Sequence, residues 1–283
     1  MMNTTLDMFN LFGLNGMHSD GDDFNQWATT ELKKLFPFLP NIKSDSEIVY
    51  SNIDELNKFK DSKILILCGG PSTSEVDWSN LDYDYVWSLN SFFLNDKFKN
   101  TKIDLMCVGG EIDFQSDDFL NYANNYNPLM LFEIHDRWYD ESIYLNALYQ
   151  SYPKLGCFHT RAYGKLGGGV RLMILALYLK AKEIYIVGSD GCPGLSVTKK
   201  QFIESKHSFE NNKHKWPWLI TEDNAYDVYY RQHEDLWNYI LNDLNFDTKI
   251  FNLGENCEFN FSSIWSKKYF PLPEDIKNKI NIS

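Results

Sequence analysis

Residues 63–73 read KILILCGGPST, an apolar run without polar alternation that ends at two glycines and a proline. A short continuous apolar run before a glycine turn is typical of a strand that is buried on both faces of a sheet. Parallel sheets bury their strands in this way because helices cover both of their faces. The stretch therefore predicts an α/β fold whose first core strand ends in a glycine turn.

Strands and helices alternate along the rest of the chain. Further runs of the same kind occur at 84–90, 103–110, 128–135, 183–191 and 248–254. Apolar residues with helical spacing occur at 167–181 and 227–245. This alternation predicts a mostly parallel, Rossmann-like sheet with helices on both faces.

We divide the chain into an N-terminal extension, residues 1–60, and an α/β domain, residues 61–283. The extension contains an amphipathic stretch that ends at Pro37 and Pro40, and we expect it to be helix and loop packed on the main domain. Residues 192–225 lack a clear period. A segment of that length inside a domain is typical of a lid or a binding loop.

Composition narrows the classes of partner. The 283 residues include 27 basic and 39 acidic side chains, for a formal net charge of −12. No basic block stands out, which argues against a nucleic-acid partner. The five cysteines form no CxxC pair, so the sequence predicts neither a disulfide framework nor a zinc site.

The chain also lacks the usual targeting and membrane signals. Its first residues have neither the basic region nor the continuous apolar core of a signal peptide. No apolar run reaches the ~18 residues of a transmembrane helix. We therefore expect a cytoplasmic protein without a transmembrane segment; peripheral membrane contact and homo-oligomerisation stay open.

Two glycine-rich segments are candidate anion sites. Gly69, Gly70, Pro71 and Ser72 follow the first strand, where parallel sheets bind ligands and where glycine lets backbone amides approach a phosphate. They match neither GxGxxG nor GxxxxGK[ST], and a plain tight turn is the alternative. Residues 167–169 are three glycines before a predicted helix, whose free N–H groups and dipole suit an anion; a flexible loop is the alternative.

Four polar side chains are further candidates. Asn90 ends a predicted strand and could pair with a base or a sugar. Asp190 ends another and could bind a ribose hydroxyl, hold a general base or ligate a metal, although both residue types are also common in turns. His233 at the start of the late helix is a candidate general base, with Tyr230 beside it as a donor to a phosphate. A lone helical histidine is more often structural.

Several segments together resemble the bacterial family 42 sialyltransferases. They are KILILCGGPSTSEVDWSNL with DYVWSLNSFF, then GGGVRLMILALYLKAKEIYIVGSDG, and then YRQHEDLWNYI, within roughly residues 63–255. The resemblance implies metal-independent, inverting transfer of sialic acid from a CMP-activated donor to a glycan hydroxyl. It implies that His233 takes the acceptor proton, that Tyr230 binds the leaving phosphate, that Asn90 holds the nucleotide, and that Gly168 and Gly169 present amides to the donor.

Two departures from the family leave another nucleotide sugar open. The family turn usually carries Asn where this chain has Gly69, and it usually has Ser or Thr where this chain has residues 167–169. The same segments also resemble the MptE-like (6-hydroxymethylpterin diphosphokinase-like) proteins of the Maf and DUF115 type. This second resemblance implies an ATP- and Mg²⁺-dependent diphosphotransferase, or a Maf-type glycosylation factor, as the alternative. A non-catalytic nucleotide-binding module is the third reading.

Overall fold

The structure is a computed structural model. It describes residues 33, 42–44, 49–51, 54–108, 112–133, 149–152, 154–159, 168–190, 246–258, 260, 266–268 and 270–282. The predicted late helix with Tyr230 and His233, and the lid-like region at 192–225, lie outside the described residues.

The described residues form a nine-stranded sheet with the order β1-β2-β8-β7-β6-β5-β3-β9-β10. The strands from β8 to β10 in that order pair in parallel, and β1 and β2 are antiparallel additions at one edge. The mostly parallel α/β fold predicted from the sequence is therefore confirmed. The strands are β1 (Ile42–Ser44), β2 (Val49–Ser51), β3 (Lys63–Leu67), β5 (Tyr85–Leu89), β6 (Leu105–Val108), β7 (Leu129–Glu133), β8 (Leu155–His159), β9 (Glu183–Val187) and β10 (Lys249–Asn252).

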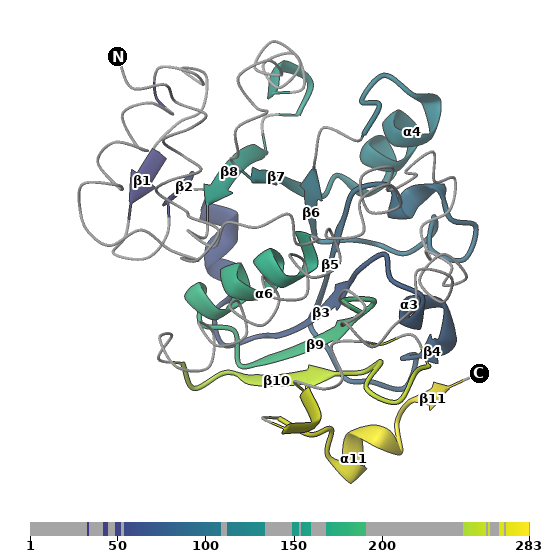
Figure 1. Cartoon of the computed structure of the whole chain (residues 1–283). Coiled ribbons are helices and arrows are strands. Elements are labelled where there is room, and N and C mark those ends of the chain that lie inside the picture. The colour runs from purple at the N-terminus through teal and green to yellow at the C-terminus, as the bar shows by residue number, and fades with distance from the viewer. Residues whose placement is uncertain are drawn as a thin grey trace, which may run out of the picture.

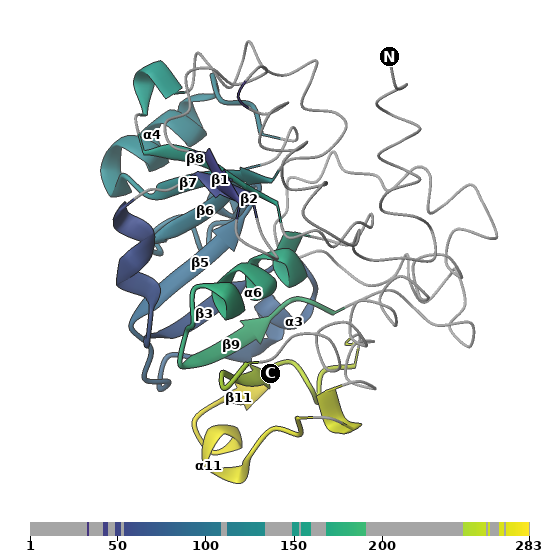
Figure 2. The same cartoon turned by 90° about the vertical axis from the view of Figure 1, so that its left-hand side faces the viewer.

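Helices cover both faces of this sheet. In Figure 1, α6 (Gly168–Tyr178) and the 3-10 helix η1 (Asp54–Phe59) lie on one side, and α3 (Ser72–Glu75) and α4 (Asp117–Tyr126) lie on the other. Figure 2 looks onto the first face, with α6 in front of β3 and β9. The 3-10 helix η2 (Phe92–Leu94) packs against α4.

The C-terminal segment lies beyond β10, at the bottom of Figure 1. It contains α11 (Glu274–Lys277) and β11 (Asn281–Ile282), and β11 pairs with the short strand β4 (Val76–Asp77) in a second, two-stranded sheet. Since β4 directly follows α3, the chain end is held beside the first βα unit.

Burial explains why these runs form strands and a core helix. Residues 64–67 of β3 have no exposed surface, and residues 169–177 of α6 are all buried. A helix that is apolar on nearly every side must be covered on nearly every side, as α6 is, with Arg171 as a buried charged exception. Each buried Leu or Ile side chain stabilises the fold by about 1.5–3 kcal/mol relative to an exposed one.

The topology reverses direction at the centre of the sheet. From β3 the chain adds β5, β6, β7 and β8 in one direction, and it then returns to add β9 and β10 on the other flank of β3. The carboxyl ends of β3 and β9 therefore lie at the point where the strand order reverses, which is where open α/β sheets bind their ligands.

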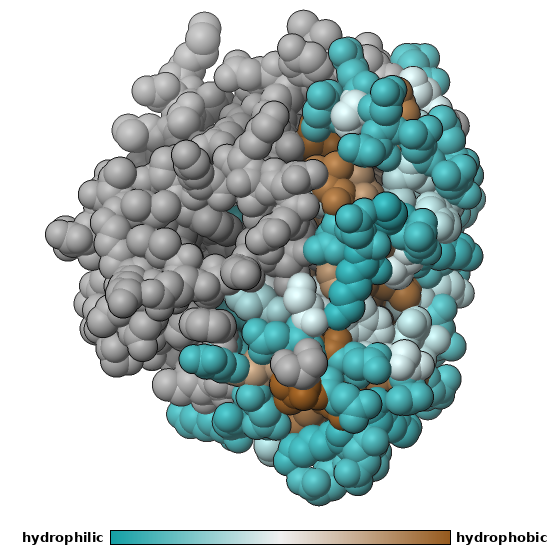
Figure 3. Space-filling model, turned by 90° about the vertical axis from the view of Figure 1, so that its right-hand side faces the viewer, coloured by the Kyte–Doolittle hydropathy of each residue, from teal (hydrophilic) through white to brown (hydrophobic). Residues whose placement is uncertain are grey.

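The surface over α3 and α4 is mainly hydrophilic, with small separate hydrophobic areas (Figure 3). Among the described residues, the exposed large hydrophobic side chain is that of Ile282, with 43% of its surface accessible. In the part of the chain that the structure describes, no helix has the length and apolar character needed to cross a bilayer.

Candidate functional site

The glycine turns that follow β3 and β9 lie side by side. Parallel pairing continues beyond the strands, because Cys68 N donates to Val187 O (2.8 Å) and Gly70 N donates to Gly188 O (2.8 Å). The predicted Gly69–Gly70 turn and the segment 188–190 therefore form one continuous piece of backbone structure at the reversal point. These two segments are far apart in the sequence.

Ser72 and Asp190 join the two turns through their side chains. Ser72 N donates to Asp190 Oδ2 (2.9 Å) and Ser72 Oγ donates to Asp190 Oδ1 (2.5 Å). The hydroxyl oxygen of Ser72 in turn accepts a hydrogen bond from Gly188 N (2.9 Å). Ser72 is completely buried and Asp190 is 4% exposed, so each carboxylate oxygen of Asp190 meets a donor of Ser72 out of contact with solvent.

Burial of Asp190 makes its carboxylate harder to ionise. Desolvation raises the pKa of Asp190 to about 6, the hydrogen bonds from Ser72 act in the opposite direction, and the negative charge of Glu75 raises the pKa further. Loss of hydration therefore outweighs the stabilisation that Ser72 gives to the charged form. At neutral pH the carboxylate is still mostly ionised.

Close packing requires glycine at two positions of these turns. A Cβ at Gly70 would collide with the Asp190 carboxylate and with Gly188 O. Gly188 has φ +74°, and a Cβ there would collide with Thr73 Oγ1 and Cys68 O. Both glycines are thus required by the contact between the turns, before any ligand is considered.

The first turn of α6 lies over the same end of the sheet. A Cβ at Gly169 would collide with Cys68 Sγ at the end of β3. A Cβ at Gly168 would lie 3.2 Å from Leu89 Cδ1 and 4.0 Å from Cys107 Sγ, at the ends of β5 and β6. The backbone N–H groups in the first turn of α6 are therefore close to the carboxyl ends of three central strands.

Asn90 marks the end of β5 at the same edge. Its φ is +51°, and its backbone N donates to Cys107 O (3.0 Å), which joins the ends of β5 and β6. Asn tolerates this left-handed conformation better than most residues do, so a backbone requirement already accounts for its presence. Its side chain is half-buried.

A third turn, which the sequence analysis did not include in the site, packs on Ser72. A Cβ at Gly254, just after β10, would lie 2.5 Å from Ser72 Oγ and 2.7 Å from Asn260 Nδ2. Asn260 Nδ2 donates to Asn252 Oδ1 (3.1 Å), and Asn252 Nδ2 donates to Ser266 Oγ (3.2 Å). The signal for this turn was present, because residues 248–254 are another apolar run that ends in glycine.

The thiols around Asp190 are not activated. Burial, followed by the charge of Asp190, raises the pKa of Cys68 far above its usual range. Burial, with the charge and hydrogen bond of Glu75, raises the pKa of Cys257 to about 12. Both thiols are therefore protonated at neutral pH and are poor nucleophiles.

The structure thus brings most of the predicted binding residues to one edge. The Gly69–Ser72 turn and Asp190 are joined directly, and Gly168, Gly169 and Asn90 lie at the ends of the neighbouring strands. Backbone N–H groups of a glycine turn and a helix start suit an anionic ligand such as a phosphate. Among the described residues, no group of three His, Cys, Asp or Glu side chains is placed to hold a metal ion.

Comparison with known proteins gives a structural likeness only. No family model matches the chain, and no curated protein matches it significantly. The chain is similar to the solved structure of the sialyltransferase CstII from Campylobacter jejuni in complex with the substrate analogue CMP-3FNeuAc. The two share 18% sequence identity with a TM-score of 0.50, and the match covers 78% of this chain and 91% of that chain. A second structure of that enzyme, with cytidine-5'-monophosphate, matches at 17% identity and a TM-score of 0.45, over 78% of this chain and 90% of that chain. At this level of identity the likeness concerns the fold: the chain has a sialyltransferase-like α/β fold.

Proposed function

We propose that this protein is a glycosyltransferase that transfers sialic acid or a related sugar from a CMP-activated donor to a glycan hydroxyl, with inversion. The observation that carries the proposal is the meeting of the glycine turn after β3 with the first turn of α6, at the reversal point of a sialyltransferase-like sheet. This is where an α/β sheet binds a nucleotide, and backbone N–H groups of a glycine turn and a helix start suit its phosphate.

The donor occupies the carboxyl edge of the sheet in this proposal. The amides of Gly69, Gly168 and Gly169 face the phosphate, and the side chain of Asn90 holds the nucleotide. Gly70 supports this turn from behind, because its N–H donates to Gly188 O (2.8 Å). The acceptor is a glycan hydroxyl. Neither a metal ion nor an organic cofactor takes part, and the protein works in the cytoplasm.

The chemical step is a single displacement. The acceptor oxygen forms a bond to the anomeric carbon of the sugar, and the bond from that carbon to the CMP phosphate oxygen breaks. CMP leaves with the bonding electron pair. His233 takes the proton of the acceptor hydroxyl, and the hydroxyl of Tyr230 donates a hydrogen bond to the leaving phosphate.

A transfer assay tests the proposal. Purified protein is incubated with CMP-sialic acid and a mixture of glycan acceptors in EDTA, and CMP release and product mass are measured. We expect acceptor-dependent CMP release that falls at least 100-fold in His233→Ala, because a positioned base contributes about 10²–10⁴-fold. Equal activity in His233→Ala would contradict the catalytic role of His233. Turnover only with ATP and Mg²⁺ would favour a diphosphokinase-like reaction instead, and nucleotide binding without turnover would favour a non-catalytic module.

A further inference from the structure

We propose that Asp190 is a positioning residue, which acts on the nucleotide through Ser72 and makes no contact with the ligand. This inference rests on the proposed function, because the turn that Asp190 positions is the proposed donor-binding turn. It changes the role expected from the sequence, in which Asp190 binds the donor itself.

The hydrogen bonds of Asp190 point to this role. Its two oxygens accept from the backbone N and the hydroxyl of Ser72, at 2.9 and 2.5 Å, and the side chain is almost completely buried. A carboxylate that binds a ribose hydroxyl needs an oxygen that faces the ligand space. Here both oxygens face a residue of the neighbouring turn, so the carboxylate sets the position of that turn.

Ser72 is the point where three strand ends meet. It follows β3, it receives a hydrogen bond from Gly188 after β9, and it lies against Gly254 after β10. Gly70 has no room for a side chain between Asp190 and Gly188, so the turn packs directly against the segment that follows β9. The Ser72–Asp190 pair therefore fixes the position of the Gly69 amide relative to the first turn of α6.

The negative charge of the Asp190 carboxylate strengthens its two hydrogen bonds with Ser72. Ser72 presents two donors, and only an acceptor at both positions satisfies them. An Asn at 190 would place its NH₂ group against one of these donors and would lose a charge-assisted bond. The Asn side chain otherwise has the same shape as that of Asp, so Asp190→Asn tests the two hydrogen bonds from Ser72 with little change in packing.

A double-mutant cycle distinguishes positioning from direct contact. The affinity for CMP is measured by calorimetry in the unmodified protein, Ser72→Ala, Asp190→Asn and the double variant. If Asp190 acts through Ser72, each single variant loses about tenfold in affinity and the double variant loses little more than either one. Independent, multiplying losses would overturn the proposal, because they would mean that Asp190 binds the nucleotide itself. In the transfer assay, the KM for the donor should rise while kcat and the acceptor KM stay within about twofold.

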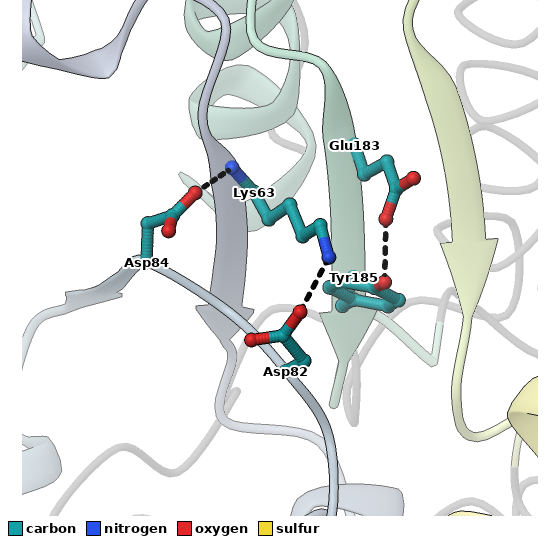
Figure 4. Close-up of polar contacts among 5 residues, drawn as sticks. All are labelled: Lys63, Asp82, Asp84, Glu183 and Tyr185. Carbon is teal, nitrogen blue, oxygen red and sulfur yellow. Dashed lines mark hydrogen bonds and ion pairs between the residues drawn. The ribbon is translucent and has the colours of Figure 1, made fainter.

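The control is a second aspartate that accepts from a backbone N at the opposite end of the sheet. Asp84 Oδ2 accepts from Lys63 N (2.8 Å), and Figure 4 shows this contact at the amino end of β3. Asp84→Asn should leave CMP affinity unchanged. If Asp190→Asn does not fold, Ser72→Ala alone decides: weaker binding supports the positioning role and unchanged binding overturns it.

Amide hydrogen exchange separates this inference from the proposed function. In Asp190→Asn, the amides of residues 69, 70 and 72–75 should exchange at least tenfold faster without any ligand, and those of β6 and β7 should not change. If the unmodified protein binds no CMP, the proposed function fails, yet faster exchange in this turn still supports positioning by Asp190. Unchanged exchange in the turn would overturn the inference, whether or not CMP binds.

Discussion

The backbone of Gly169, in the first turn of α6, lies directly against the side chain of Cys68 at the end of β3. No side chain fits between them. The start of the helix is therefore held close to the glycine turn that continues from Cys68, and this closeness brings two sets of backbone donors to one edge of the sheet.

Gly169→Ala should destabilise the protein and weaken nucleotide binding. Its Cβ would collide with Cys68 Sγ, and overpacking of this kind costs about 1–3 kcal/mol. Urea denaturation measures the loss. Gly168→Ala is the matched control, because its nearest contact is the movable end of Leu89, at 3.2 Å. Cys68→Ala should recover part of the loss in the Gly169→Ala background; a loss that is unchanged there would contradict the collision as its cause.

Replacing Asn90 by Gly separates the side-chain amide from the backbone conformation. Gly adopts φ +51° readily, so Asn90→Gly should unfold at nearly the same urea concentration as the unmodified protein. CMP affinity should fall about tenfold if the amide binds the nucleotide. Asn90→Ala should add a loss of stability, since Ala is strained at positive φ. Full CMP affinity in a stable Asn90→Gly variant would show that Asn90 serves the backbone alone.

Asp190 gives the stability of the fold a pH dependence of definite sign. Its folded-state pKa of about 6 is above the value of about 3.9 in an unfolded chain, so between these two pH values the folded state holds more of the proton. The contribution of Asp190 to stability is therefore greatest below the lower value and falls as the pH rises through the upper one, by about 1.4 kcal/mol for each unit of difference. The free energy of unfolding, compared between the unmodified protein and Asp190→Asn at several pH values, measures this. A difference in favour of the unmodified protein that grows from pH 4 to pH 6 would contradict the raised pKa.

The amide cluster after β10 should stabilise the site from the side of the C-terminal segment. Asn252→Ala removes the hydrogen bonds to Asn260 and Ser266, and we expect a loss of about 1–3 kcal/mol in the free energy of unfolding. Because Gly254 lies against Ser72, amide exchange should also quicken around Ser72. The exposed Asn281→Ala is the control. An effect confined to β10, with exchange at Ser72 unaltered, would show that this turn does not support the site.

The central strands could be predicted because their apolar runs are continuous and end at glycine. The runs at 63–68 and 183–187 correspond closely to β3 (Lys63–Leu67) and β9 (Glu183–Val187), and the glycine-led helix at 167–181 corresponds to α6 (Gly168–Tyr178). Buried strands and buried helices carry the strongest apolar signal. That signal also predicted that the strand ends, where we place the candidate site, lie at one edge of the sheet.

Weaker elements were missed for physical reasons. β1 and β2 have three residues each, too few to show a period, and they add to the sheet from the segment expected to be helix and loop. β8 contains Gly156 in a five-residue run. For α4, the signals were present but overlooked: Ser116 caps it by accepting from Phe119 N, and Asn127 ends it at φ +44°.

The pairing within the site could not be predicted from the sequence. Ser72 and Asp190 are 118 positions apart, and the strand pattern places both at the same edge without saying which side chains meet. Asp190 was expected to face the ligand because it ends a strand of the sheet, and ligands bind at the carboxyl ends of parallel strands. Whether it also touches a nucleotide is decided by the double-mutant cycle.

The most direct test of the nucleotide site is a thermal-shift panel with CMP, CDP, UDP, GDP and ATP, each in EDTA and in Mg²⁺. A ligand that binds the folded state alone raises the melting temperature. We predict selective stabilisation by CMP in EDTA, lost in Gly169→Ala and reduced in Asp190→Asn. Stabilisation by ATP only in the presence of Mg²⁺, or by none of the five nucleotides, would contradict a CMP site at the carboxyl ends of β3 and β9.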